Sequence, residues 1–120
     1  MTVIIAGSRD MKLPVDVIDS FVNNSGFTIT TLLCGMATGI DLSAYDWGKE
    51  NGVTIKTFFP DWKKYGKSAG VIRNQEMADN ADALILIWDG QSRGSANMKA
   101  EAKKRNLLIS EHVIKKGASR

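Results

Sequence analysis

The sequence predicts an α/β protein: one Rossmann-like domain of three layers, in which a mostly parallel five-stranded sheet carries helices on both faces. Short apolar stretches of strand length alternate along the chain with longer amphipathic stretches of helix length. Each return to a parallel strand needs such a crossover. The chain has 120 residues, 43% of them hydrophobic and 24% charged, as in a globular domain with its own core. We therefore expect residues 1–120 to form a single domain.

Strand and helix alternate through the first half of the chain. Residues 3–6 and 30–34 are short apolar runs, each closed by a glycine, which predicts two buried strands. Pro14 can open a helix between them, because proline is favoured at the first helical position. A second helix is expected over 41–51, with Asp41 as its N-cap.

The second half repeats this alternation. The run 83–88 is apolar at every position, which is typical of a parallel strand buried on both faces. The other elements expected here are a strand over 53–59, a loop over 61–67, a helix over 68–80, a helix over 95–106 capped by Ser95, and a strand within 107–114.

Composition excludes several classes of protein. The longest apolar run has only six residues, whereas a membrane helix needs about 20, and the sequence begins without the pattern of a secretion signal. A lone Cys34 suits a reducing compartment. One cysteine and one histidine leave too few soft ligands for a structural zinc site. We expect a cytoplasmic protein with no metal, cofactor or membrane partner.

The charge is mildly basic. Lysine and arginine number 16 against 13 acidic residues, a net charge of +3. Much of the excess lies near the C-terminus and forms either a solvated helix face and chain end or a region that contacts phosphate. These residues are Lys99, Lys103, Lys104, Arg105, Lys115, Lys116 and Arg120.

Three clusters rich in glycine and polar residues follow the first, second and fourth predicted strands. They are Gly-Ser-Arg at 7–9, Gly-Met-Ala-Thr-Gly-Ile-Asp at 35–41 and Asp-Gly-Gln-Ser-Arg-Gly-Ser at 89–95. Ligands of open α/β sheets bind beyond the carboxyl ends of the strands, where the strand order reverses. In a 3-2-1-4-5 order, the first and last clusters would face each other there.

The cluster at 89–95 has the groups that bind phosphate. Its glycines let the backbone approach a ligand, Ser95 is expected to begin a helix whose N–H groups favour an anion, and Arg93 offers a planar charged fork. A phosphate cradle is favoured over a plain turn. The candidate ligand-binding residues are Gly7, Ser8, Arg9, Gly35, Gly39, Asp41, Arg73, Asn74, Asp89, Gly90, Ser92, Arg93, Gly94 and Ser95.

Several of these residues also have a structural interpretation. Asp41 either caps its helix or accepts hydrogen bonds from ribose hydroxyls, and it can do both. Arg73, near the start of its helix, contacts an anion or forms an ion pair on its own helix. Trp62 and Tyr65 either stack on a base or cover the edge of the sheet.

Two common nucleotide-binding motifs are absent from the sequence. No G-x-G-x-x-G follows the first strand, and no G-x-x-x-x-G-K-[ST] occurs anywhere in the chain. Their absence disfavours classical NAD oxidoreduction and ATP hydrolysis.

Five segments in order resemble the SLOG superfamily, close to its small YspA-like proteins. They are I-I-A-G-S-R at 4–9, C-G-M-A-T-G-I-D at 34–41, F-P-D-W at 59–62, G-K-S-A-G-V-I-R-N-Q-E-M at 66–77 and W-D-G-Q-S-R-G-S at 88–95. The second segment is also similar to the DNA-processing protein A family, whose Rossmann-like core binds single-stranded DNA. The Lonely Guy phosphoribohydrolases, which release a base from a nucleoside monophosphate, share the fold.

The resemblance implies a nucleotide-like ligand held by these loops. Arg73 and Met77 match an Arg and a Met of the Lonely Guy pattern, and Gly94 with Ser95 matches the Gly-Thr of its phosphate loop. The glutamate that would support departure of the base is replaced by Met98. This departure from the pattern puts hydrolysis in doubt and leaves binding intact.

Three functions follow as hypotheses. The first is binding of a nucleotide or a nucleotide-derived signal. The second is N-glycosidic hydrolysis of a nucleotide, in which Arg73 steadies the phosphate or leaving group and Glu76 or Glu101 serves as acid and base. The third is binding of single-stranded nucleic acid, for which the charge of the chain is modest.

The resemblance also implies self-association, as a homodimer or a higher homo-oligomer paired through helices. Trp47, Met77 and Met98 either lie on such a pairing face or complete the core.

Overall fold

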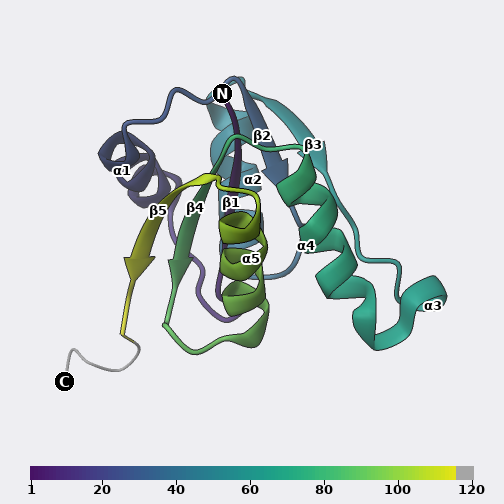
Figure 1. The fold of residues 1–120 in the computed structure, drawn as a ribbon. Helices are drawn as coiled ribbons and strands as arrows, with labels where there is room; N and C mark the ends of the chain where they lie inside the picture. The colour runs from purple at the N-terminus through teal and green to yellow at the C-terminus, as the bar shows by residue number, and fades with distance from the viewer. Residues whose placement is uncertain (116–120) are drawn as a thin grey trace.

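The structure, a computed structural model, describes residues 1–115. Five parallel strands form one sheet in the order β3-β2-β1-β4-β5 (Figure 1). The α/β class, the parallel sheet and the strand order are confirmed. The elements are β1 (Thr2–Gly7), α1 (Val15–Ser25), β2 (Thr31–Cys34), α2 (Ile40–Glu50), β3 (Thr54–Thr57), α3 (Trp62–Tyr65), the 3-10 turn η1 (Gly66–Ser68), α4 (Ala69–Asp79), β4 (Ala83–Trp88), α5 (Arg93–Lys104) and β5 (Leu108–Val113).

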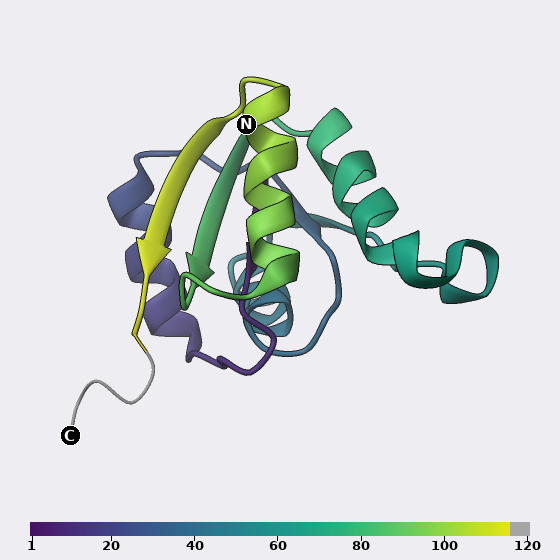
Figure 2. The same cartoon turned by 60° about the horizontal axis from the view of Figure 1, so that its bottom comes forward.

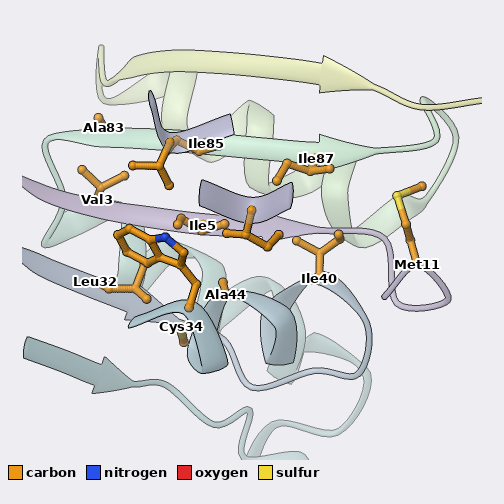
Figure 3. Close-up of a cluster of buried hydrophobic side chains, with 13 residues drawn as sticks. Val3, Ile5, Met11, Leu32, Cys34, Ile40, Ala44, Ala83, Ile85 and Ile87 are labelled. Atoms are coloured by element: carbon orange, nitrogen blue, oxygen red, sulfur yellow. The ribbon is translucent and has the colours of Figure 1, made fainter. Parts of the chain in front are cut away.

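The sheet divides the core into two layers, because successive side chains of a strand point to opposite faces. Val3 and Ile5 of β1 lie in the cluster that α1 and α2 cover, together with Ile85 of β4 (Figure 3). Ile4 of β1 and Leu84 of β4 lie in the other cluster, which α4 and α5 cover. Helices therefore cover both faces, as the sequence predicts.

Local signals set the ends of α1. Pro14 stands at its N-cap, and Gly26 ends it in a left-handed conformation with φ +75°, a common way for a helix to stop. The indole N–H of Trp47 on α2 donates to Asp19 of α1 over 3.0 Å. This bond ties the two helices of one face together.

Two helices begin earlier than the sequence predicts, so the N-cap assignments of Asp41 and Ser95 are wrong. The N-caps are Gly39 for α2 and Ser92 for α5. The Asp41 carboxylate instead accepts the N–H of Ala37 over 3.1 Å. Asp89 accepts the N–H groups of Gln91 and Ser92 over 2.9 and 3.0 Å, which turns the chain sharply ahead of α5.

The segment 61–67, expected as a loop, contains α3 and most of η1 instead. Asp61 caps α3, because its carboxylate accepts the N–H of Lys64 over 3.1 Å. The strand expected over 53–59 is shorter, β3 at Thr54–Thr57. Figure 1 shows α3 extending away from the sheet at the start of α4.

The residues proposed for a pairing face lie in the core. Trp47 is 4% exposed, and Met77 and Met98 are each 1% exposed, so the interpretation that they contact a second subunit is wrong. Cys34 is buried in β2, and burial raises the pKa of its thiol to about 12, as for a packed small hydrophobe. In the described part of the chain, no helix is long and apolar enough to cross a membrane.

The basic residues near the C-terminus are partly engaged within the fold. Lys99 pairs with Glu111 over 2.8 Å, and Arg105 pairs with Asp79 and Glu101 over 2.7 and 2.8 Å. Lys116 and Arg120, which belong to the same predicted group, lie outside the described residues.

Candidate functional site

A cleft of about 540 Å³ lies at the carboxyl ends of β1 and β4. The order of the sheet reverses between these two strands, since β1 is followed by β2 on one side and β4 by β5 on the other. This is where open parallel sheets bind ligands. The lining residues are Ala6, Gly7, Arg9, Asp10, Ala37, Asp41, Trp62, Lys67, Gly70, Val71, Arg73, Asn74, Met77, Asp89, Ser92, Arg93, Gly94, Ser95, Asn97 and Met98.

Ser8 lies behind the cleft and connects the segments that line it. It is fully buried, and its N–H donates to the carbonyl of Ile87 over 3.2 Å while its carbonyl accepts the N–H of Ile40 over 3.1 Å. Its hydroxyl accepts the N–H of Asp89 over 3.1 Å. Ser8 thus joins the ends of β1 and β4 to the start of α2, and it leaves Arg9 at the cleft.

The N-terminus of α5 lines the cleft. The first hydrogen bond within the helix runs from Ala96 N–H to Ser92 C=O over 3.0 Å, so the amides of residues 93–95 precede the helical ladder and favour an anion. Ser95 is 4% exposed. Among residues 1–115, neither its hydroxyl nor that of Ser92 has a hydrogen-bond partner.

Asp41 is a buried carboxylate on the opposite wall. It is 5% exposed, and one oxygen, Oδ2, accepts the Ala37 N–H. The other oxygen, Oδ1, has no hydrogen-bond partner within the described residues. Burial raises the pKa of Asp41 from 3.8 to about 6, and the Ala37 N–H, the cations of Arg73 and Arg9 and the backbone of Gly7 offset this only in part. The group is therefore able to hold or release a proton near neutral pH.

Arg73 and Asn74 connect the walls of the cleft. Arg73 donates from one terminal nitrogen to the carbonyl of Gly35 and from Nε to the Asn74 side chain over 2.9 Å. Asn74 donates to the side chain of Asn97 on α5 over 2.9 Å. Burial lowers the pKa of Arg73, and the nearby Asp41 carboxylate opposes that shift. The network fixes both side chains between the loop after β2 and α5.

Charged groups of both signs surround the cleft. The cations are Arg9, Lys67, Arg73 and Arg93, and the acidic residues are Asp10, Asp41 and Asp89. In residues 1–115, no group of three or more His, Cys, Asp or Glu side chains is placed to hold a metal ion.

Comparison with known proteins assigns the family. The family described as "YspA, cpYpsA-related SLOG family" matches residues 1–65. The chain belongs to this family. The gene 61 protein of Mycobacterium phage D29 is 31% identical over 115 residues, an alignment that covers 89% of this chain and 92% of that protein. No solved structure gives a significant match.

Membership of the SLOG family confirms the resemblance seen in the sequence and indicates nucleotide-related binding or processing. The matched segment contains the clusters at 7–9 and 35–41. The groups contributed by α4 and α5 lie beyond it.

Most candidate ligand-binding residues of this SLOG protein line the cleft. They are Gly7, Arg9, Asp41, Arg73, Asn74, Asp89, Ser92, Arg93, Gly94 and Ser95. Ser8, Gly35, Gly39 and Gly90 are not among the lining residues. Ser8 and Gly35 instead support the site from behind, through their hydrogen bonds to Asp89 and Arg73.

The two glutamates considered as acid and base lie elsewhere. Glu76 is exposed on α4. Glu101 is buried on α5, where its carboxylate accepts from Arg105 over 2.8 Å, and neither residue lines the cleft. Arg73, the third residue of that hypothesis, does line it.

Asn97 and Lys67 line the cleft but are absent from the predicted set. Asn97 lies within one helical turn of Ser95 on α5. The predicted phosphate loop at the start of this helix was therefore the signal that could have identified Asn97. Lys67 belongs to the small basic stretch before α4, whose helical turns were not expected.

Proposed function

We propose that this SLOG protein binds a nucleotide or a nucleotide-derived signalling ligand in the cleft, with a phosphate group at the start of α5. The observation that carries the proposal concerns unpartnered buried polar atoms. In residues 1–115 these side-chain atoms are Asp41 Oδ1, Ser92 Oγ and Ser95 Oγ, and all three residues line the same cleft. Buried polar groups are normally satisfied, so a polar ligand, with ordered water in its absence, is the expected partner.

The two walls suit different parts of a nucleotide. The amides at 93–95, the two serine hydroxyls and the Arg93 guanidinium are all donors, which match phosphate oxygens. Asp41 offers an acceptor on the other wall, which matches a sugar hydroxyl. Arg9 and Arg73 supply further positive charge near that carboxylate.

The first experiment identifies the ligand. The purified protein is incubated with a pool of nucleotides and nucleotide-derived signals, protein and filtrate are separated, and both are analysed by mass spectrometry. An intact nucleotide retained with the protein supports the proposal. Free base together with ribose phosphate in the filtrate would contradict simple binding.

The retained nucleotide is then titrated calorimetrically into Arg93→Ala and Arg9→Ala. Loss of a charge-assisted hydrogen bond should weaken binding roughly ten- to a hundredfold. Lys49→Ala is the matched control, because it removes one positive charge from the exposed far end of α2. Unchanged affinity in both arginine variants would refute the proposed phosphate site.

Hydrolysis remains the second candidate, and one observation favours it. Asp41 lines the cleft and has a pKa of about 6, which suits a general acid. In this version the bond between the base and C1′ of the sugar breaks, and Asp41, in place of Glu76 or Glu101, gives its proton to the departing base. Water adds to C1′ and returns a proton to the Asp41 carboxylate. Asp41→Asn should then abolish release of base, whereas Glu76→Gln and Glu101→Gln should retain it.

A further inference from the structure

Exposed apolar side chains gather on the segment that contains α3. Phe59, Trp62, Tyr65 and Val71 are 68%, 52%, 39% and 38% exposed. Figures 1 and 2 show α3 standing off the sheet beside the start of α4, on the side of the molecule away from β5. Of these side chains, Trp62 and Val71 line the cleft, whereas Phe59 and Tyr65 do not.

Trp62 differs from the other two tryptophans. Trp47 and Trp88 are 4% and 7% exposed, and each uses its indole N–H within the fold, donating to Asp19 and Glu111 over 3.0 and 2.9 Å. Both complete the core. Trp62 is instead half-exposed and lies in a segment where Phe59, Tyr65 and Val71 are exposed as well, and grouped exposed apolar surface is typical of binding sites.

The local structure keeps the indole in place. Asp61 holds α3 through the Lys64 N–H to its carboxylate and the Tyr65 N–H to its carbonyl, over 3.1 and 3.0 Å. A Cβ placed on Gly70 would lie 3.7 Å from the indole Cη2, so the edge of the ring lies against the first turn of α4. The absence of a side chain at Gly70 leaves this wall open.

The cleft therefore has an aromatic side and an anion-binding side, in addition to the wall that carries Asp41. Trp62, Gly70 and Val71 form the first, and the start of α5 forms the second. Aromatic side chains bind bases by stacking, since every base has a flat π face. A planar heterocycle attached to a phosphate could contact the aromatic side and the start of α5 at the same time.

We propose that Trp62 stacks on the aromatic base of the bound ligand. The inference rests on the proposed function and deepens it: the ligand of this site carries a nucleobase, and a sugar phosphate alone does not fill the cleft.

The experiment compares ligands with and without a base. AMP, GMP, CMP, UMP and ribose 5-phosphate are titrated calorimetrically into the wild-type protein, Trp62→Ala and Tyr65→Ala. The wild type should bind at least one of the nucleotides roughly five- to a hundredfold more tightly than ribose 5-phosphate, from one base stack. Trp62→Ala should lose that advantage and bind ribose 5-phosphate as the wild type does. Tyr65→Ala, on the same short helix but outside the cleft, should match the wild type.

Fluorescence gives a second reading of the same contact. Trp62 is the exposed tryptophan, so the preferred nucleotide should protect part of the emission from acrylamide quenching, and ribose 5-phosphate should not. A melting temperature of Trp62→Ala close to that of the wild type would show that its fold is intact.

The outcomes separate the two proposals. Equal affinity of the wild type for ribose 5-phosphate and all nucleotides, or an equal loss for both ligand types in Trp62→Ala, overturns base stacking and leaves phosphate binding in place. The same loss in Tyr65→Ala also overturns it, because the effect would then belong to α3 as a whole. Binding of none of the probes overturns the inference, and the proposed function is then decided separately by the nucleotide pool of the first experiment.

Discussion

A single carboxylate carries an energetic cost in this fold. Asp41 is 5% exposed and keeps one oxygen without a hydrogen-bond partner in the part of the chain that is described. A buried charge that is only partly compensated disfavours the folded state. Such costs are typical of binding sites, where a ligand completes what the protein leaves open. The cost should therefore be visible in the pH dependence of stability.

We predict that Asp41→Asn changes the pH dependence of the free energy of unfolding. Because the folded pKa of about 6 lies above the ordinary 3.8, the folded state binds more protons between these values. Stability should consequently fall as the pH rises from 4 to 6, and the full penalty should be present above pH 6. The difference between wild type and variant should change by about 2–3 kcal/mol between pH 4 and 7.

Urea denaturation at each pH measures this difference. Asp46→Asn is the matched control, since Asp46 is exposed on the same helix, and its difference from the wild type should stay nearly flat. A flat difference for Asp41→Asn as well would show that Asp41 titrates normally in the folded protein.

At the scale of elements, α4 and α5 are joined at the ends that lie away from the cleft. Arg105, just after α5, donates to Asp79 at the end of α4 and to Glu101 over 2.7 and 2.8 Å. Glu101 is 3% exposed, and its carboxylate also accepts a hydrogen bond from the Gln75 side chain over 3.5 Å. The hydrogen bond from Arg105 leads the interactions that hold the pKa of Glu101 below its usual value. This contact fixes how α4 and α5 pack.

Arg105→Ala should lower the melting temperature by several degrees, because it leaves the Glu101 carboxylate buried without its main partner. Asp79→Ala should have a smaller effect, since the Asp79 side chain is 62% exposed and exposed ion pairs contribute little. Thermal unfolding followed by circular dichroism at pH 7 compares the two. Equal shifts would mean that the surface pair, and not the buried carboxylate, carries the interaction.

The elements that local sequence controls were predicted well. The strand at 83–88 has the predicted bounds, because its apolar side chains leave no alternative to burial on both faces. Helix α1 begins next to Pro14 as expected, because proline acts through its own backbone. The starts of α2 and α5 were predicted too late in the sequence. The Asp41 and Asp89 carboxylates accept hydrogen bonds from amides of the preceding turns, and the helices begin after Gly39 and Ser92 instead.

The site was predictable where topology alone brings residues together. Arg9 and Arg93 follow two strands that end at the same edge, so their meeting at the cleft needs only the strand order. Asn97 reaches the cleft through helix packing, which no local pattern predicted. Trp62 was named as a residue that could stack on a base, but the helix α3 that carries it was expected as a loop. Glu101 lies near the phosphate loop in the sequence, but the packing of α5 against α4 turns it toward Arg105.

At the scale of the whole molecule, the cleft lies between two halves that meet at the β1–β4 pair. Arg9 and Asp41 come from the half that contains β1, β2 and β3, and Arg73 and Ser95 come from the half that contains β4 and β5. Val3 to Ala6 of β1 pair with Ala83 to Leu86 of β4. A ligand that contacts both walls requires both halves to be in place.

Binding should therefore stabilise the whole fold and not only the loops. A nucleotide present at about a hundred times its Kd adds about 2.7 kcal/mol to the free energy of unfolding. The amides of β1 and β4, which lie in the centre of the sheet, should exchange through global unfolding and slow about a hundredfold. Exposed positions at the edge, such as those near Leu108 of β5, open locally and should slow much less. Hydrogen exchange with and without the nucleotide tests this, and protection restricted to residues 89–95 would mean that the ligand contacts only one half.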